Sequence, residues 1–118
     1  MKNDWKSLRD EVVAFRDARD WKQFHTAKNL VAGLAIEAAE LQEQFLWCTD
    51  VECEARIRDK IRRKAIAEEL ADVVNYALLL ANHMGLDLPA EIRKKIKVNA
   101  RKYPVSKSKG LAKKYTEL

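Results

Sequence analysis

The sequence has few of the residues that break regular structure: its 118 residues include three glycines and two prolines. Because these two residue types dominate tight turns, their scarcity indicates long helices joined by few connections. Two cysteines, Cys48 and Cys53, are too few for a disulfide framework and do not form a zinc site by themselves. We therefore expect free thiols in a reducing, cytoplasmic location.

Long apolar segments are also missing. The most apolar stretch, residues 76–81, is far shorter than a membrane span. The first residues, Met1 to Trp5, lack the apolar core of a signal peptide. The sequence therefore predicts no membrane partner and no secretion signal.

The length and charge narrow the class of protein further. With 118 residues, 47% hydrophobic and 35% charged, the chain fits one globular domain. A domain of this size buries only about two-thirds of the surface that its unfolded chain exposes, so a deep internal pocket is difficult to build. A site shared between subunits solves this problem, and we expect a homo-oligomer. The net charge of +5 suits an anionic partner, but the charge alone does not choose among a nucleotide, a nucleic acid and a membrane surface.

Hydrophobic periodicity predicts four helices, at about residues 4–19, 26–47, 57–84 and from 89 to just before Pro104. A loop is expected at residues 48–58, where the sequence is charged and less periodic. Thr26 is a typical N-cap, Gly85 a typical C-terminal cap and Pro89 a typical first-turn residue. The prediction is an all-α domain at residues 1–104, followed by a basic, partly flexible tail at residues 105–118.

The third predicted helix is apolar nearly all round at residues 76–81. Such a helix is normally surrounded by others. In so short a chain, part of this cover is expected to come from a second subunit, which would complete the four-helix bundle as a dimer or a dimer of dimers.

Four acidic residues occupy unusual helix positions. At about 100° per residue, Glu37 lies at the edge of an apolar stripe and Glu40 lies one step further round. Gly33, one turn below, is expected to leave open space beside them. Glu69 projects from the middle of the next helix's apolar face, and Asp72 flanks it on the same side.

These placements favour a bound cation. A charged, unpaired carboxylate in an apolar environment costs several kcal/mol, and two such pairs on packed helices repel each other. Oxygen ligands favour Mg²⁺, with Mn²⁺ as a substitute, over zinc. A di-iron bundle requires Glu-x-x-His pairs, and neither His25 nor His83 stands three residues after a glutamate. Glu-x-x-Glu alone usually marks a solvated face; the second pair and the lack of Lys or Arg within one turn of Asp72 favour a metal site.

Basic and aromatic residues supply candidate substrate contacts. Lys95, Asn99 and Lys102 share one helix face, where lysines suit a polyphosphate, although such runs are usually only solvated. Trp21 and Trp47 are apolar plates on which a base can stack, although tryptophans more commonly pack in a core.

The sequence resembles the MazG-type pyrophosphohydrolases, most closely their small dCTP pyrophosphatase branch. The resemblance covers residues 8–118, with a shortened central loop. The matching segments are Arg19-Asp20-Trp21, Gln23-Phe24-His25, Asn29-Leu30, Glu37-x-x-Glu40, Glu69-x-x-Asp72, Asp87-Leu88-Pro89, Lys95 with Asn99, Lys102-Tyr103-Pro104 and the final Lys114-Tyr115-Thr116-Glu117-Leu118.

This resemblance implies an α-helical fold whose subunits pair and often form a tetramer. It implies Mg²⁺ at Glu37, Glu40, Glu69 and Asp72. The implied substrate contacts are Trp21, Trp47 and Tyr76 for the base and sugar and Lys95, Asn99, Lys102 and Tyr103 for the phosphates. Within the matched opening segment, Asn29 is a further candidate contact, and His25 either bonds to the substrate or caps the second predicted helix. Val12 stands where the dCTP branch is expected to have a polar histidine, which leaves the preferred base open.

The resulting hypothesis is an Mg²⁺-dependent hydrolase that cleaves a nucleoside triphosphate, with dCTP the leading candidate, to a monophosphate and pyrophosphate. Water attacks the α-phosphorus, and Glu40 is the first candidate for its base, with Glu37 also in the catalytic pair and Glu43 an alternative base. A basic helical nucleic-acid-binding or scaffold protein is the rival hypothesis. It accounts for the charge of +5, but it does not account for four acids on apolar faces.

Overall fold

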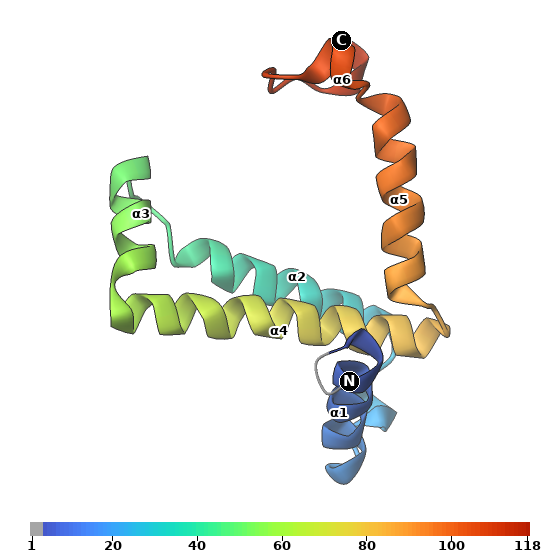
Figure 1. Cartoon of the computed structure of the whole chain (residues 1–118). Helices are drawn as coiled ribbons and strands as arrows, with labels where there is room; N and C mark the ends of the chain where they lie inside the picture. Colours follow the sequence, from blue (N-terminus) through green and yellow to red (C-terminus); the bar gives the residue numbers. More distant parts are fainter. Residues whose placement is uncertain (1–3) are drawn as a thin grey trace. The chain divides into compact units, whose positions relative to one another are not determined.

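The computed structural model describes residues 4–118 and contains helices throughout that range, with no strand (Figure 1). The elements in chain order are α1 (Trp5–Ala18), η1 (Lys22–Phe24), α2 (Ala27–Glu43), α3 (Asp50–Arg58), α4 (Lys60–Met84), α5 (Leu88–Lys102), α6 (Val105–Ser108) and η2 (Tyr115–Glu117). The predicted all-α class is confirmed. Residues 1–3 lie outside the described range. They belong to the predicted domain at residues 1–104 and to the N-terminal segment that was predicted not to be a signal peptide. None of the helices described is long and apolar enough to cross a membrane.

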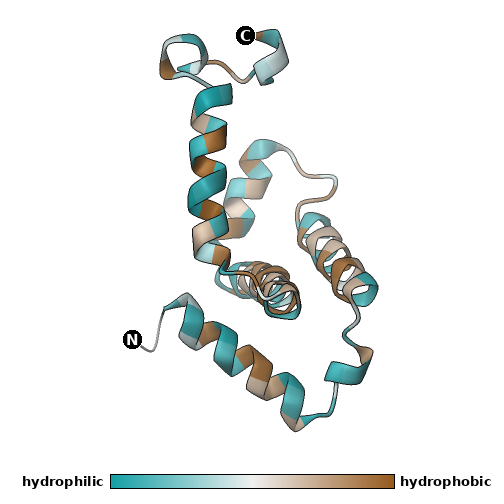
Figure 2. Ribbon diagram, turned by 90° about the vertical axis from the view of Figure 1, so that its right-hand side faces the viewer, coloured by the Kyte–Doolittle hydropathy of each residue, from teal (hydrophilic) through white to brown (hydrophobic). Residues whose placement is uncertain are grey.

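The chain divides into two compact units, Met1–Gly85 and Leu86–Leu118. In the first unit, α2 and α4 run antiparallel and pack along each other, while α1 and α3 pack against α4 (Figure 1). The hydrophobic side chains buried in the described part are Leu30 of α2 and Leu78, Leu79 and Ala81 of α4. Hydrophobic and hydrophilic residues alternate along α1 at helical spacing (Figure 2), so one face of α1 can cover this core.

Helix α2 begins where the sequence predicts and ends earlier. The Thr26 side chain accepts a hydrogen bond from the Asn29 amide at 3.2 Å, as expected for an N-cap. The predicted end at Trp47 is wrong, because α2 ends at Glu43. Beyond it, the amides of residues 44–46 bond to carbonyls three residues back, which tightens the chain into 3₁₀-type turns. Trp47 then takes a φ of 62°, in the left-handed region that usually stops a helix.

The loop predicted at residues 48–58 is wrong, because most of this segment forms helix α3. The Thr49 hydroxyl accepts from the Glu52 amide at 3.2 Å and donates to the Glu52 carboxylate at 3.1 Å. This capping pair starts a helix that has acids in its first turn and arginines in its last, as the helix dipole favours. Arg56 Nη1 donates to the Gln44 carbonyl at 2.5 Å and ties α3 to the end of α2.

The ends of α4 and α5 agree closely with the prediction. Gly85 caps α4 with a φ of 67°, which glycine adopts without strain. The Asp87 side chain caps α5, which begins at Leu88, and α5 ends before Pro104 as expected. Within the second unit, the Tyr103 and Tyr115 rings meet edge to face at 5.9 Å. The predicted flexibility of the 105–118 tail stays a prediction.

Candidate active site

Three of the four singled-out acids meet where α2 and α4 pack together. Glu37 and Glu40 project from α2 and Glu69 from α4, and each offers a carboxylate oxygen within 4.8 Å of the other two. The two helices face each other along most of their length, so residues one turn apart on α2 reach the same point on α4. The structure therefore gathers these carboxylates from two distant parts of the sequence.

The environment of this cluster disfavours three full negative charges. One oxygen each of Glu37 and Glu69 is buried and has no hydrogen-bond partner. Burial is the first cause that raises the pKa of Glu37, to about 7, and the neighbouring carboxyls of Glu40, Glu69 and Asp72 raise it further. Burial likewise raises the pKa of Glu69, with Glu40 and Asp72 adding to the effect. Without a cation, the cluster thus retains protons that isolated carboxyls would have released.

A hard divalent cation fits this arrangement. The donors are all carboxylate oxygens, which are the ligands that Mg²⁺ and Mn²⁺ prefer. The unpaired oxygens of Glu37 and Glu69 are the atoms whose burial a cation would compensate. Asp72 is exposed and is not one of the three residues whose oxygens meet, but its charge raises the pKa of both glutamates, so it lies close to the cluster.

The raised pKa of Glu37 makes the metal-free chain sensitive to pH. Its folded pKa of about 7 lies above its usual value of 4.5, so the folded state binds more protons between these values. Stability is therefore lost as pH rises from about 4.5 to 7. In thermal unfolding with a chelator present, the midpoint temperature of the wild-type protein should decrease as the pH is raised from 5 to 8. A Glu37→Gln variant should show a smaller fall; an equal fall in both proteins would contradict this assignment.

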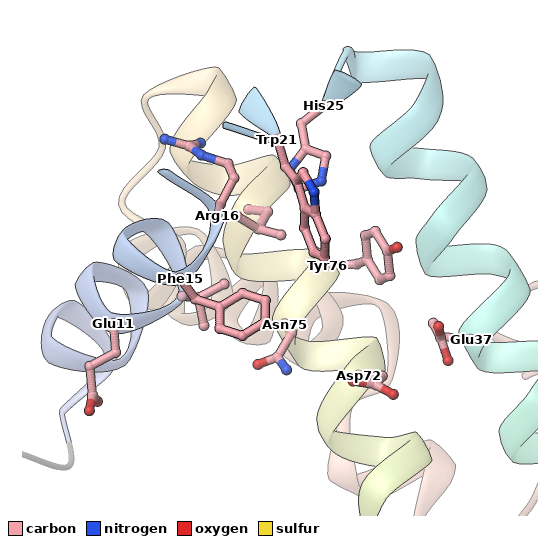
Figure 3. Close-up of a pocket in the computed structure, with 11 residues that line it drawn as sticks. Glu11, Phe15, Arg16, Trp21, His25, Glu37, Asp72, Asn75 and Tyr76 are labelled. Atoms are coloured by element: carbon pink, nitrogen blue, oxygen red, sulfur yellow. The ribbon is translucent and has the colours of Figure 1, made fainter. Parts of the chain in front are cut away.

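A cavity of about 430 Å³ lies beside Glu37 and Asp72 and is lined by residues of α1, α2 and α4 and by Trp21 and His25, which flank η1. Its lining comprises Glu11, Val12, Phe15, Arg16, Trp21, His25, Glu37, Asp72, Asn75, Tyr76 and Leu79. Figure 3 shows Glu37 and Asp72 at one end of the cavity, Glu11 on the opposite side, and the rings of Phe15, Trp21, His25 and Tyr76 between them. Five of the predicted site residues therefore share one cavity: Trp21, His25, Glu37, Asp72 and Tyr76.

The space expected beside Gly33 is filled. A Cβ built on Gly33 would lie 2.6 Å from Cζ of Tyr76 and closer still to the neighbouring ring atom. The expectation of open space there is therefore wrong. The missing side chain of Gly33 lets the Tyr76 ring lie directly against α2, between the acids and Trp21.

The aromatic wall is held by contacts among its own members. Trp21 is 44% exposed, and its ring meets the Phe15 ring edge to face at 5.8 Å. The Nδ1 atom of His25 is buried without a partner, and burial, together with the nearby Arg16 charge, lowers the pKa of His25. His25 thus presents a neutral imidazole to the cavity, where a hydrogen-bonding ligand would satisfy Nδ1.

Other predicted residues lie outside this cavity. Trp47 follows α2 and is 93% exposed. The Asn29 side-chain amide donates to the Phe24 carbonyl at 2.9 Å and thereby joins η1 to α2. Lys95, Asn99, Lys102 and Tyr103 belong to the second unit, where Lys102 Nζ lies 4.8 Å from the centre of the Tyr115 ring.

Sequence reasoning assigned no role to three polar residues that line the cavity: Glu11, Arg16 and Asn75. Arg16 is buried, and its guanidinium pairs with Asp17 at 2.8 Å. The sequence positions of all three residues indicated that they could lie near the site. Glu11 and Arg16 adjoin the Val12 and Phe15 stripe, and Asn75 stands three residues after Asp72 on the same helix face.

The chain is similar to known proteins over most of its length. The MazG-like family model matches residues 33–118. The chain belongs to the MazG-like family. It is 41% identical over 113 residues to dCTP pyrophosphatase 1 of Rattus norvegicus and of Mus musculus, and 40% identical to that of Homo sapiens. In each case the alignment covers 96% of this chain and 66% of the relative, so the chain spans just under two-thirds of these proteins.

A solved structure agrees with this family. A pyrophosphatase from Archaeoglobus fulgidus DSM 4304 superposes with a TM-score of 0.75 at 39% identity, covering 84% of this chain and 91% of that one. The MazG-like all-α fold predicted from the motifs is thereby confirmed.

Proposed function

We propose that this chain is a nucleotide pyrophosphohydrolase that uses Mg²⁺ to cleave dCTP or a related deoxynucleotide to the monophosphate and pyrophosphate. The observation that carries the proposal is the meeting of Glu37, Glu40 and Glu69 beside an aromatic cavity. Family membership and the names of the relatives support the same reaction class.

The acids would hold the cation, with Mn²⁺ as a substitute. Glu37 and Glu69 each have a buried, unpaired oxygen, a carboxylate oxygen of Glu40 lies within 4.8 Å of one from each of them, and Asp72 stands one turn beyond Glu69. When bound, Mg²⁺ would neutralise charge on the phosphate oxygens and on the departing pyrophosphate.

Hydrolysis adds water across the α–β phosphoanhydride bond. The water oxygen bonds to the α-phosphorus, the bond to the bridging oxygen breaks, and pyrophosphate leaves with that oxygen. Glu40 accepts the proton of the water, because it is the one clustered glutamate for which no buried, unpaired oxygen is found. Glu37 is the second carboxyl of this catalytic pair.

The remaining contacts divide between the ends of the substrate. Trp21 and Tyr76 line the space for the base and sugar, and the unpaired Nδ1 atom of His25 is available for a hydrogen bond there. Asn29 supports this wall through its bond to Phe24. We assign the phosphates to the polar residues of α5, namely Lys95, Asn99, Lys102 and the adjoining Tyr103.

The small core supports assembly into a dimer or tetramer. Val31 and Ile36 of α2 and Ile61 and Leu70 of α4 are each more than half exposed within the first unit. Such apolar exposure on the two central helices favours burial against a second copy. Trp47, 93% exposed, would complete the base pocket from a neighbouring subunit.

Sedimentation at micromolar concentration should show a dimer or tetramer, and a Leu70→Glu variant should shift the protein towards monomer. A monomeric wild type would contradict this assembly.

The half-buried free thiols, Cys48 and Cys53, suit a reducing cytoplasm.

An experiment can distinguish the proposed enzyme from the rival scaffold or nucleic-acid-binding function. Incubation with each of the eight common NTPs and dNTPs plus Mg²⁺ should yield monophosphate and pyrophosphate, fastest from a deoxynucleotide. The rival function is supported if no nucleotide is cleaved and the chain instead retains nucleic acid.

A further inference from the structure

Asn75 is a polar residue without a partner inside the cavity. It lies on α4 in an otherwise apolar stretch, Val73 to Leu79. Asn75 is exposed and lines the cavity, and its carboxamide makes no hydrogen bond to any residue in the described range, so it is open to a ligand. Figure 3 shows this carboxamide between the Phe15 ring and the Asp72 carboxylate.

The position of Asn75 along α4 matches one part of a nucleotide. Asn75 follows Asp72 by three residues, so the two share a face and are separated by about 4.5 Å of helix rise. In the proposed function, Glu37 and Asp72 mark the phosphate end of the cavity, and Trp21 marks the aromatic end. In a nucleotide the sugar joins the phosphate to the base, so residues that line the cavity beside Asp72, as Asn75 and Tyr76 do, are placed to meet the sugar.

We propose that Asn75 is a specificity-determining contact for the sugar and hydrogen-bonds to the 3′-hydroxyl of the nucleotide; this inference rests on the proposed function. A 5′-triphosphate of deoxyribose has one free sugar hydroxyl, at the 3′ position. That hydroxyl donates and accepts, and a carboxamide offers both an acceptor oxygen and a donor nitrogen. Asn75 thereby distinguishes a 3′-hydroxyl from a 3′-hydrogen without reading the base.

The test compares the deoxynucleotide that wild type hydrolyses fastest with its 2′,3′-dideoxy analogue. A neutral hydrogen bond of this kind corresponds to about a fivefold preference. Wild type should prefer the deoxynucleotide by about that factor in kcat/KM, mainly through KM. Asn75→Leu, which keeps the size and removes the polar atoms, should lose this preference by slowing on the deoxynucleotide alone, with the ranking of bases unchanged.

Asn82→Leu is the matched control, because Asn82 lies two turns further along α4 and outside the cavity lining. It should keep the wild-type preference. Calorimetry with the non-hydrolysable α,β-methylene forms of the same two nucleotides should show the same ratio in Kd, which separates binding from turnover.

Three outcomes would overturn the assignment. If Asn75→Leu keeps the preference for the 3′-hydroxyl, Asn75 does not bind the sugar, while the proposed function stands. If the ranking of bases changes instead, Asn75 reads the base. If wild type releases pyrophosphate from no nucleotide, the proposed function fails and the sugar contact falls with it.

Discussion

Replacing Glu69 with Gln should lower kcat for pyrophosphate release by on the order of a hundredfold or more, as expected when a group that supports transition-state charge is lost. Glu69 shares the carboxylate cluster with Glu37 and Glu40 and has a buried oxygen without a partner. Glutamine keeps the size of the side chain but removes the charge that attracts the cation. Calorimetric titration with Mg²⁺ in the absence of nucleotide should show weak binding to wild type and none to the variant.

Glu68→Gln provides the matched control for this experiment. Glu68 is the preceding residue on α4, is exposed and lies 4.0 Å from Lys64 in an ion pair. The substitution makes the same change of charge, yet Mg²⁺ binding and kcat should stay within about twofold of wild type because an exposed ion pair contributes little. Equal losses in the two variants would show that net charge, and not the cluster, determines the effect.

Replacing Trp21 with Ala should raise KM by on the order of tenfold to a hundredfold, because stacking of a base on an aromatic ring contributes about 1–3 kcal/mol. The Trp21 ring lines the cavity, and its edge-to-face contact with Phe15 holds it in place. Stacking tolerates any base, so KM should rise for all deoxynucleotides by similar factors. Steady-state kinetics across the four common dNTPs measures this.

Trp5→Ala controls for the loss of a large aromatic residue. Trp5 is 41% exposed, similar to Trp21, but it lies at the start of α1 and outside the cavity lining. Its replacement should leave KM within about twofold of wild type. If Trp21→Ala changes kcat but leaves KM unchanged for every base, Trp21 is not the stacking platform.

Helical periodicity was sufficient to predict most of the fold because the long helices carry strong apolar stripes and recognisable caps. Thr26 and Gly85 define the start of α2 and the end of α4 as their residue types predict. Periodicity failed at α3, where charged residues occupy most positions and no apolar stripe forms. The signal there was the Thr49-x-x-Glu52 capping pair, which local hydrogen bonding reveals and hydrophobicity does not.

Some features of the candidate site could likewise be predicted from the sequence, and others could not. The facing positions of Glu37 and Glu69 followed from helix geometry, because residues on apolar faces of packed helices must approach each other. The filling of the space beside Gly33 by Tyr76 depended on the contact between two helices, which one helix's pattern does not encode. Asn75 went unassigned because an isolated asparagine in an apolar run reveals a role only when the surrounding cavity is known.

The most direct test of the central claim is the position of bond cleavage. Wild-type protein, Mg²⁺ and dCTP are incubated in water enriched in ¹⁸O, and the products are separated and weighed by mass spectrometry. Attack at the α-phosphorus predicts dCMP carrying one ¹⁸O atom together with unlabelled pyrophosphate. Labelled pyrophosphate with unlabelled dCMP, or dCDP with orthophosphate, would contradict the account.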